Sequence, residues 1–97
     1  MSPGIKEDAM QKYTVYGARM TDREEAHIEL AQSLQLPAYY GKNLDALWDA
    51  LGDMQGEIIL KDAAKLLNSL EVYGCKLIQT MFEAADKNPN LIFHLAE

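Results

Sequence analysis

The chain has 97 residues, of which 48% are apolar and 25% charged, and its net charge is −6. This length supports one domain with a modest core, and the apolar fraction argues against a disordered chain. A protein that neutralises nucleic-acid phosphates needs clustered Lys and Arg, and the sequence has no such cluster. The composition therefore points away from nucleic acid, and the acidic balance suits a basic partner or serves solubility alone.

The single cysteine, Cys75, leaves no partner for an internal disulfide and favours a reducing compartment. No apolar run approaches the roughly 20 residues that span a bilayer. The first eleven residues also lack the apolar centre of a signal peptide. We therefore expect a cytoplasmic protein that does not contact membrane, needs no cofactor and, since nothing demands a dimer, is a monomer.

Residues 1–11 are polar with an early Pro-Gly, which predicts a loose lead-in to one domain over residues 12–97. The segment KYTVY (12–16) alternates and is β-branched and aromatic, as expected of a short strand. Next, TDRE (21–24) matches a capping box with Thr21 as N-cap. We expect a helix of about 14 residues from there, ending before Pro37, with an apolar stripe at His27, Leu30, Ala31 and Leu34.

A loop is predicted over PAYYGK (37–42), in which Gly41 is free to take a backbone shape that other residues resist. Asn43 is a good N-cap for the following helix. The apolar side chains of that helix repeat at i, i+3, i+4 and i+7, which defines one buried face: Leu44, Leu47, Trp48 and Leu51.

The remaining chain continues the alternation of strands and helices. EIILK (57–61) predicts a buried strand, and Asp62 is a candidate cap for a short helix with Leu66, Leu67 and Leu70. A longer helix is predicted over about 72–87, ended by NPN (88–90), and LIFHL (91–95) reads as a last strand. Strands separated by helices imply β-α-β units, so the fold class is α/β with a parallel sheet.

Three aspartates form a possible functional row. Asp45, Asp49 and Asp53 recur every four residues, so along a continuous helix they share one face, and Glu57 continues the run in sequence. Lys42 is the only basic residue between positions 39 and 57. The row is either a solvated face or, beside the aromatic side chains of this stretch, a binding surface.

Catalysis and metal binding are less well supported than binding. Exposed carboxylates on one helix would both ionise, whereas acid–base pairs need their pKa values pushed apart. The sequence lacks the common phosphate-loop, serine-hydrolase and zinc-protease motifs. Two aspartates per turn, without a loop or His ligand, are a weak metal signal, and we expect no metal.

The histidines, the cysteine and the methionines are expected to have packing roles and not catalytic ones. His27 on a helix stripe and His94 in a strand are expected to be packed histidines, and Cys75 a partly buried thiol. Met20, Met54 and Met81 are scattered along the chain and are expected to fill gaps in the core.

The stretch LQLPAYYGKNLDALWDAL (34–51) closely resembles the barstar family, the intracellular inhibitors of barnase-type secreted ribonucleases. Its Leu-Pro, paired Tyr, Gly and Asn-Leu-Asp-Ala-Leu-Trp-Asp occur in unbroken order, and a weaker resemblance covers roughly residues 13–96. It implies a small domain whose three-stranded parallel sheet packs against helices. In that family the motif helix and the loop before it block the nuclease active site.

The resemblance also implies the site. The expected partner-binding residues are Tyr39, Asn43, Leu44, Asp45, Trp48 and Asp49, with Tyr40, Gly41, Asp53, Met54 and Glu83 as possible additions. Asp49 resembles the acidic residue that occupies the phosphate pocket. A nuclease cleft is cationic, so an inhibitor can place carboxylates where phosphates would lie.

The chain departs from the family pattern at two positions. Met54 stands where the family's namesake has a second Trp, and Ala84 falls where that inhibitor has an acidic contact, with Glu83 one position earlier. A neighbouring helical residue points about 100° away, which makes Glu83 a poor substitute. The expected function is inhibition of a barnase-like ribonuclease or a related basic nuclease toxin. The alternative is an acidic interaction or immunity module with a different basic partner.

Overall fold

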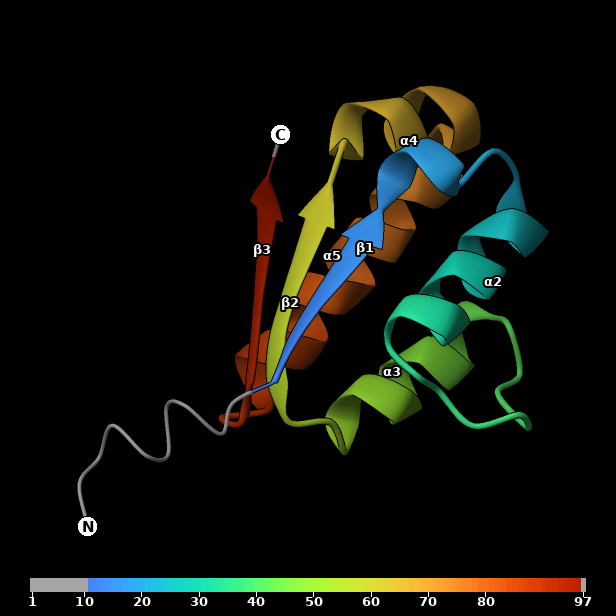
Figure 1. Ribbon diagram of the computed structural model, residues 1–97. Helices are drawn as coiled ribbons and strands as arrows, with labels where there is room; N and C mark the ends of the chain where they lie inside the picture. Colours follow the sequence, from blue (N-terminus) through green and yellow to red (C-terminus); the bar gives the residue numbers. More distant parts are fainter. Residues whose placement is uncertain (1–10, 97) are drawn as a thin grey trace, which may run out of the picture.

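The computed structural model describes residues 11–96, so all but one residue of the expected lead-in lie outside the described part. Within it, three parallel strands form one sheet in the order β1-β2-β3 (Figure 1). The elements in chain order are β1 (Lys12–Tyr16), the 3-10 turn η1 (Gly17–Arg19), α2 (Arg23–Ser33), α3 (Leu44–Gly52), β2 (Gly56–Lys61), α4 (Ala63–Leu70), α5 (Val72–Lys87) and β3 (Leu91–Ala96). The predicted α/β class and three-stranded parallel sheet are confirmed.

The helices lie on one face of the sheet. In Figure 1, α5 crosses behind the strands, α2 lies beside β1, and no helix of residues 11–96 covers the front of the sheet. Burial along the strands follows from this arrangement: Ile58 and Leu60 are completely buried, whereas Ile92 and His94 on the front face are exposed. The core joins alternate strand residues to the helix stripes, with Leu30, Leu47, Leu66, Leu77 and Met81 fully buried. Each such side chain contributes roughly 1.5–3 kcal/mol through burial.

Two predicted helix caps are wrong. Asp22, not Thr21, caps α2, and its carboxylate accepts a hydrogen bond from the Glu25 N–H at 2.8 Å. A carboxylate caps at least as well as a hydroxyl and also interacts favourably with the helix dipole. α2 has 11 residues instead of about 14, because it begins one residue later and also ends at Ser33, shortly before Gln35 takes a positive φ of 58°. Asp62 precedes α4 with a left-handed backbone (φ 57°) and makes no side-chain cap; its carbonyl instead accepts from the Lys65 N–H.

The expected backbone freedom at Gly41 is not used. The neighbouring Lys42 takes the positive φ, 56°, that turns the chain into α3. Gly41 is instead close to the helix: a Cβ there would lie 3.2 Å from Cβ of Ala46. The absence of a side chain therefore serves close packing at this position.

Asn88 fixes the C-terminal end of α3 from a distant part of the chain. Its side chain is buried, and Nδ2 donates to the carbonyl oxygens of Leu51 (2.9 Å), Gly52 (3.3 Å) and Met54 (2.8 Å). Its Oδ1 accepts from the Asn90 N–H at 3.0 Å. Carbonyls at a helix end have no partner within the helix, so this one amide satisfies groups that burial would otherwise leave unpaired.

We predict that Asn88→Ala lowers the free energy of unfolding by about 1–3 kcal/mol, because buried carbonyls lose their donor. Urea unfolding monitored by circular dichroism measures the change. Asn90→Ala is the matched control, since this neighbouring side chain is exposed. Equal stability of the two variants would show that the amide does not hold α3.

Candidate functional site: the acidic helix and its flanks

Helix α3 begins at the predicted residue. Asn43 is the N-cap, and its Oδ1 accepts from the Ala46 N–H at 2.7 Å. Its Nδ2 donates to the Gly41 carbonyl at 3.3 Å, which ties the preceding loop to the helix start. The loop and the first turn of α3 are therefore one hydrogen-bonded unit.

The apolar face of α3 holds it against the core. Leu47 and Leu51 are fully buried, while Leu44 and Trp48 are half-buried. The Lys87 ammonium of α5 lies 5.9 Å from the centre of the Trp48 ring. Trp48 thus contributes its face to the contact between α3 and α5.

The three aspartates are exposed, but they do not form one continuous helical row. Asp45 and Asp49 belong to α3, which ends at Gly52, and Asp53 follows as its C-cap. Glu57 is separated from them, because it lies in β2 and pairs with His94 across the sheet. Within the described residues, none of the three aspartates takes part in an ion pair.

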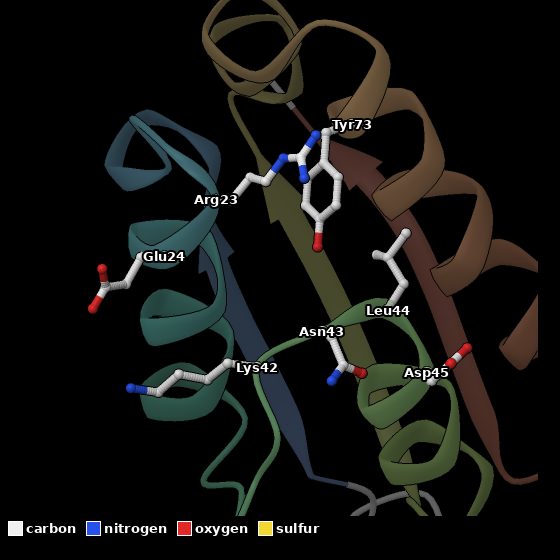
Figure 2. Close-up of a pocket in the computed structure, with 7 residues that line it drawn as sticks. All are labelled: Arg23, Glu24, Lys42, Asn43, Leu44, Asp45 and Tyr73. Carbon is white, nitrogen blue, oxygen red and sulfur yellow. The ribbon is translucent and has the colours of Figure 1, made fainter.

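Two hollows flank α3. The first, of about 550 Å³, lies between the first turns of α2, α3 and α5 (Figure 2). Its lining comprises Arg23, Glu24, Lys42, Asn43, Leu44, Asp45 and Tyr73. Figure 2 shows the Arg23 guanidinium against the Tyr73 ring, 4.3 Å from the ring centre, while Lys42 and Glu24 point away from this pair.

The second hollow, of about 380 Å³, carries carboxylates without a basic residue in its lining. It is lined by Leu36, Pro37, Tyr39, Tyr40, Gly41, Ala46, Asp49, Ala50 and Asp53. The Tyr39 side chain is 88% exposed at this hollow, which leaves the ring free for a partner. An exposed aromatic ring, small apolar side chains and two carboxylates together form a surface suited to a cationic side chain.

A buried histidine holds the loop that precedes α3. His27 of α2 lies 2.7 Å through Nδ1 from the Tyr40 hydroxyl and 2.7 Å through Nε2 from the Tyr73 hydroxyl. A neutral imidazole donates one of these bonds and accepts the other. Burial lowers the pKa of His27 and raises that of Tyr40, so both groups stay neutral at pH 7. The packed histidine predicted at position 27 is confirmed.

The structure brings most of the expected binding residues together around α3. Asn43, Leu44 and Asp45 line the first hollow, and Tyr39, Tyr40, Gly41, Asp49 and Asp53 line the second. Trp48, Met54 and Glu83 line neither. Met54 is half-buried, and its carbonyl accepts from Asn88, whereas Glu83 is exposed on α5 and accepts from Gln79 Nε2 at 3.0 Å. Ala84 is buried, so that position presents no side chain to a partner.

Several neighbours of the site had no signal in the sequence. Arg23 and Tyr73 are separated by 50 positions and meet only because α2 and α5 pack near each other. Two expectations for single residues are wrong: Cys75 is exposed, and His94 is an exposed partner of Glu57. The exposure of His94 follows from its place on the open face of the sheet, which none of the described helices covers. Met20 and Met81 are buried as expected.

Within residues 11–96, no group of three or more His, Cys, Asp or Glu side chains is placed to hold a metal ion. None of the helices in this range is both long and apolar enough to cross a bilayer.

The fold and the surface define a class of protein: a small α/β domain whose exposed acidic helix and aromatic loop are suited to binding another protein. Comparison with known proteins gives the family. The family model described as "Barstar (barnase inhibitor)" matches residues 10–95. A Bacillus subtilis (strain 168) protein named "Putative ribonuclease inhibitor YrdF" is 32% identical over 81 residues, which cover 80% of this chain and 89% of that protein. The chain belongs to the barstar family.

We predict that the pH dependence of stability contains a contribution from His27. Because its pKa in the folded protein lies below the ordinary value of 6.5, the unfolded chain binds this proton more readily. The contribution is complete above pH about 6.5 and is lost as pH falls towards the folded pKa, by at most about 1.4 kcal/mol per pH unit. Urea unfolding of wild type and His27→Gln at pH 7.5, 6.5 and 5.5 measures it.

A side chain that does not titrate supplies the control. Asn90→Ala, at an exposed position, should keep the wild-type loss of stability between pH 6.5 and 5.5, whereas His27→Gln should reduce it. The same pH dependence in wild type and His27→Gln would contradict the assignment.

Proposed function

We propose that this protein inhibits a barnase-like secreted ribonuclease by placing α3 and the preceding loop in the basic active-site cleft. Membership of the barstar family supports ribonuclease inhibition as the general function. Beyond this general function, we propose that the target is a barnase-like enzyme, that α3 and the loop before it block the enzyme, and that the protein acts in the cytoplasm. The proposed binding residues are Tyr39, Asn43, Leu44, Asp45, Trp48 and Asp49. Additional candidates are Tyr40, Gly41, Asp53, Met54 and Glu83.

The exposed carboxylates of Asp45 and Asp49 are the main support for this proposal. Both carboxylates are exposed, and in residues 11–96 neither is part of an ion pair. Asp49 also shares its hollow with the exposed Tyr39 ring. A cationic cleft that holds RNA offers such carboxylates the partners they lack, and complementary charge speeds encounter as well as fixing orientation.

Preorganisation supports the same interpretation. The loop is tied to α3 through Asn43 and to α2 through the bond between Tyr40 and His27. A binding surface that is already ordered loses less conformational entropy when the partner docks. The face is therefore prepared for binding before a nuclease arrives.

A related basic nuclease toxin, with this protein as its immunity partner, is the second candidate. Two cations, Arg23 and Lys42, line the hollow at the start of α3. In addition, Ala84 leaves no acidic contact at its position on α5. Both features favour a cleft whose charge distribution differs from that of barnase.

We predict that the purified protein inhibits at least one ribonuclease from a panel of barnase-like enzymes at equimolar concentration. The same preparation should cleave no RNA by itself. Fluorogenic RNA cleavage with and without the protein measures both. If every enzyme of the panel stays fully active with excess protein, the proposed target class is wrong, and nuclease toxins of other types become the next panel.

We predict that Asp49→Ala weakens binding to the inhibited nuclease by about 2–5 kcal/mol, because cations of the cleft would be buried without a counter-charge. This general range includes measurements on the barnase–barstar pair. Unfolding free energy should change by less than about 1 kcal/mol, since the side chain is exposed. Titration calorimetry and urea unfolding give the two values.

Two controls separate binding from folding and from net charge. Leu47→Ala removes a fully buried side chain and should cost about 2–5 kcal/mol of stability, reducing binding only through the unfolded fraction. Asp86→Ala changes net charge equally from an exposed position on α5 and should bind almost as wild type does. Wild-type affinity of Asp49→Ala would exclude α3 as the blocking element.

A further inference from the structure

The two hollows beside α3 differ in charge. Arg23 and Lys42 line the first, and no basic residue lines the second. Glu24 and Asp45 also line the first hollow, yet within residues 11–96 neither carboxylate forms an ion pair with a cation. Both cations are exposed on a chain whose net charge is −6. The face around α3 therefore presents charges of both signs to a partner.

Arg23 is held in position before any partner arrives. Its guanidinium lies 4.3 Å from the centre of the Tyr73 ring (Figure 2), and the Tyr73 hydroxyl is bonded to the buried His27 at 2.7 Å. A guanidinium stacked on a ring keeps the N–H groups at its edge available, and their fork matches the two oxygens of a carboxylate. No carboxylate of residues 11–96 is paired with it. Arg23 is therefore a preorganised donor for an anion of the partner.

Lys42 adds a second cation from the loop before α3. It takes a φ of 56°, a left-handed backbone conformation that a residue with a side chain adopts at a cost, and this turn places Lys42 in the lining of the first hollow. The first turns of α2, α3 and α5 surround the same hollow, and the positive ends of their dipoles add to the potential there. Glu24 points away from the Arg23 guanidinium (Figure 2). The surroundings of Arg23 therefore favour a negative group.

We propose that the target nuclease carries an acidic side chain, Asp or Glu, at the rim of its basic cleft, and that this carboxylate enters the first hollow beside Arg23 and Lys42. The inference rests on the proposed function, in which Asp49 enters the cleft itself. A rim that was basic throughout would meet two like charges beside the acidic helix, and like charges at an interface reduce affinity. An acidic group there instead completes a complementary pattern of charge, which fixes how the inhibitor is oriented on the nuclease. Arg23 and Lys42 thus determine which nucleases are bound.

The direction of the change in affinity when Arg23 is neutralised tests the proposal. Arg23→Gln makes the inhibitor more acidic, so it should bind a wholly basic cleft more tightly. If a carboxylate lies in the hollow, Arg23→Gln should instead raise Kd for the inhibited ribonuclease of the panel about tenfold, and Lys42→Gln about threefold, in titration calorimetry. Lys65→Gln is the matched control, because it removes the same charge from an exposed position on α4, outside both hollows. It should leave Kd within about twofold of wild type.

Two further measurements separate a lost ion pair from a displaced Tyr73 ring. The loss in Arg23→Gln should shrink between about 50 mM and 500 mM salt, since screening weakens a charge pair at the edge of an interface, whereas a displaced ring would give the same loss at both. The rim carboxylates of the nuclease are also replaced by amides one at a time. One of these nuclease variants should abolish the effect of Arg23→Gln, as expected of a direct partner. Urea unfolding of each inhibitor variant confirms that it is folded.

Equal or tighter binding of Arg23→Gln would overturn the inference, as would an equal loss in Lys65→Gln or a loss that salt does not change. Saturable binding of inorganic phosphate to the free protein, abolished in Arg23→Gln, would assign the hollow to a small anion and also overturn it. Asp49→Ala in the same titration keeps the two proposals separate. Wild-type affinity of that variant contradicts the blocking role of α3, whereas wild-type affinity of Arg23→Gln contradicts only the acidic contact at the rim.

Discussion

The position of α3 depends on the side-chain amide of Asn88, which lies at the C-terminal end of α5 and donates to the carbonyls of Leu51, Gly52 and Met54. A nine-residue helix is too short to be stable by itself in water, so α3 needs tertiary contacts to exist at all. Its N-terminal end is fixed by Asn43 within the loop, and its apolar face by burial of Leu47 and Leu51. The C-terminal carbonyls of α3 receive their donor from Asn88, and without it Asp49 and Asp53 would lie on a fraying turn.

Local patterns determined what the sequence could predict. The strand at 12–16 and the helix at 72–87 have the predicted bounds, because period-2 and period-3.6 alternation report which side is buried. Asn43 was predictable, since a cap acts within three residues. Asn88 reads in sequence only as a helix stop, because its partners lie 34–37 positions earlier. The pairing of Arg23 with Tyr73 is equally long-range, and it depends on the packing of two helices.

The bond between His27 and Tyr40 explains why the two adjacent tyrosines differ. Tyr40 is half-buried, and its hydroxyl is occupied by the histidine, so its role is to hold the loop. With Tyr40 held inward, the side chain of the preceding residue, Tyr39, points into solvent. In the sequence the two tyrosines form one aromatic pair. In the structure Tyr40 packs towards the interior, whereas the Tyr39 ring is exposed. Tyr73 of α5 bonds the other nitrogen of His27. The Tyr39 ring is therefore positioned by three segments, namely α2, α5 and the loop before α3.

Asp45 lies in the first turn of α3, where a carboxylate is favourable, but the other two aspartates lie at the opposite end of the helix. The negative end of a helix dipole disfavours carboxylates, and Asp49 and the C-cap Asp53 lie at that end. No basic residue occupies the last turn to offset them. At the start of α2, by contrast, Asp22, Glu24 and Glu25 lie where carboxylates stabilise. The chain therefore places carboxylates favourably at the start of α2 and unfavourably at the end of α3, near the exposed Tyr39. Under the proposed function, a cationic partner would offset this loss of stability.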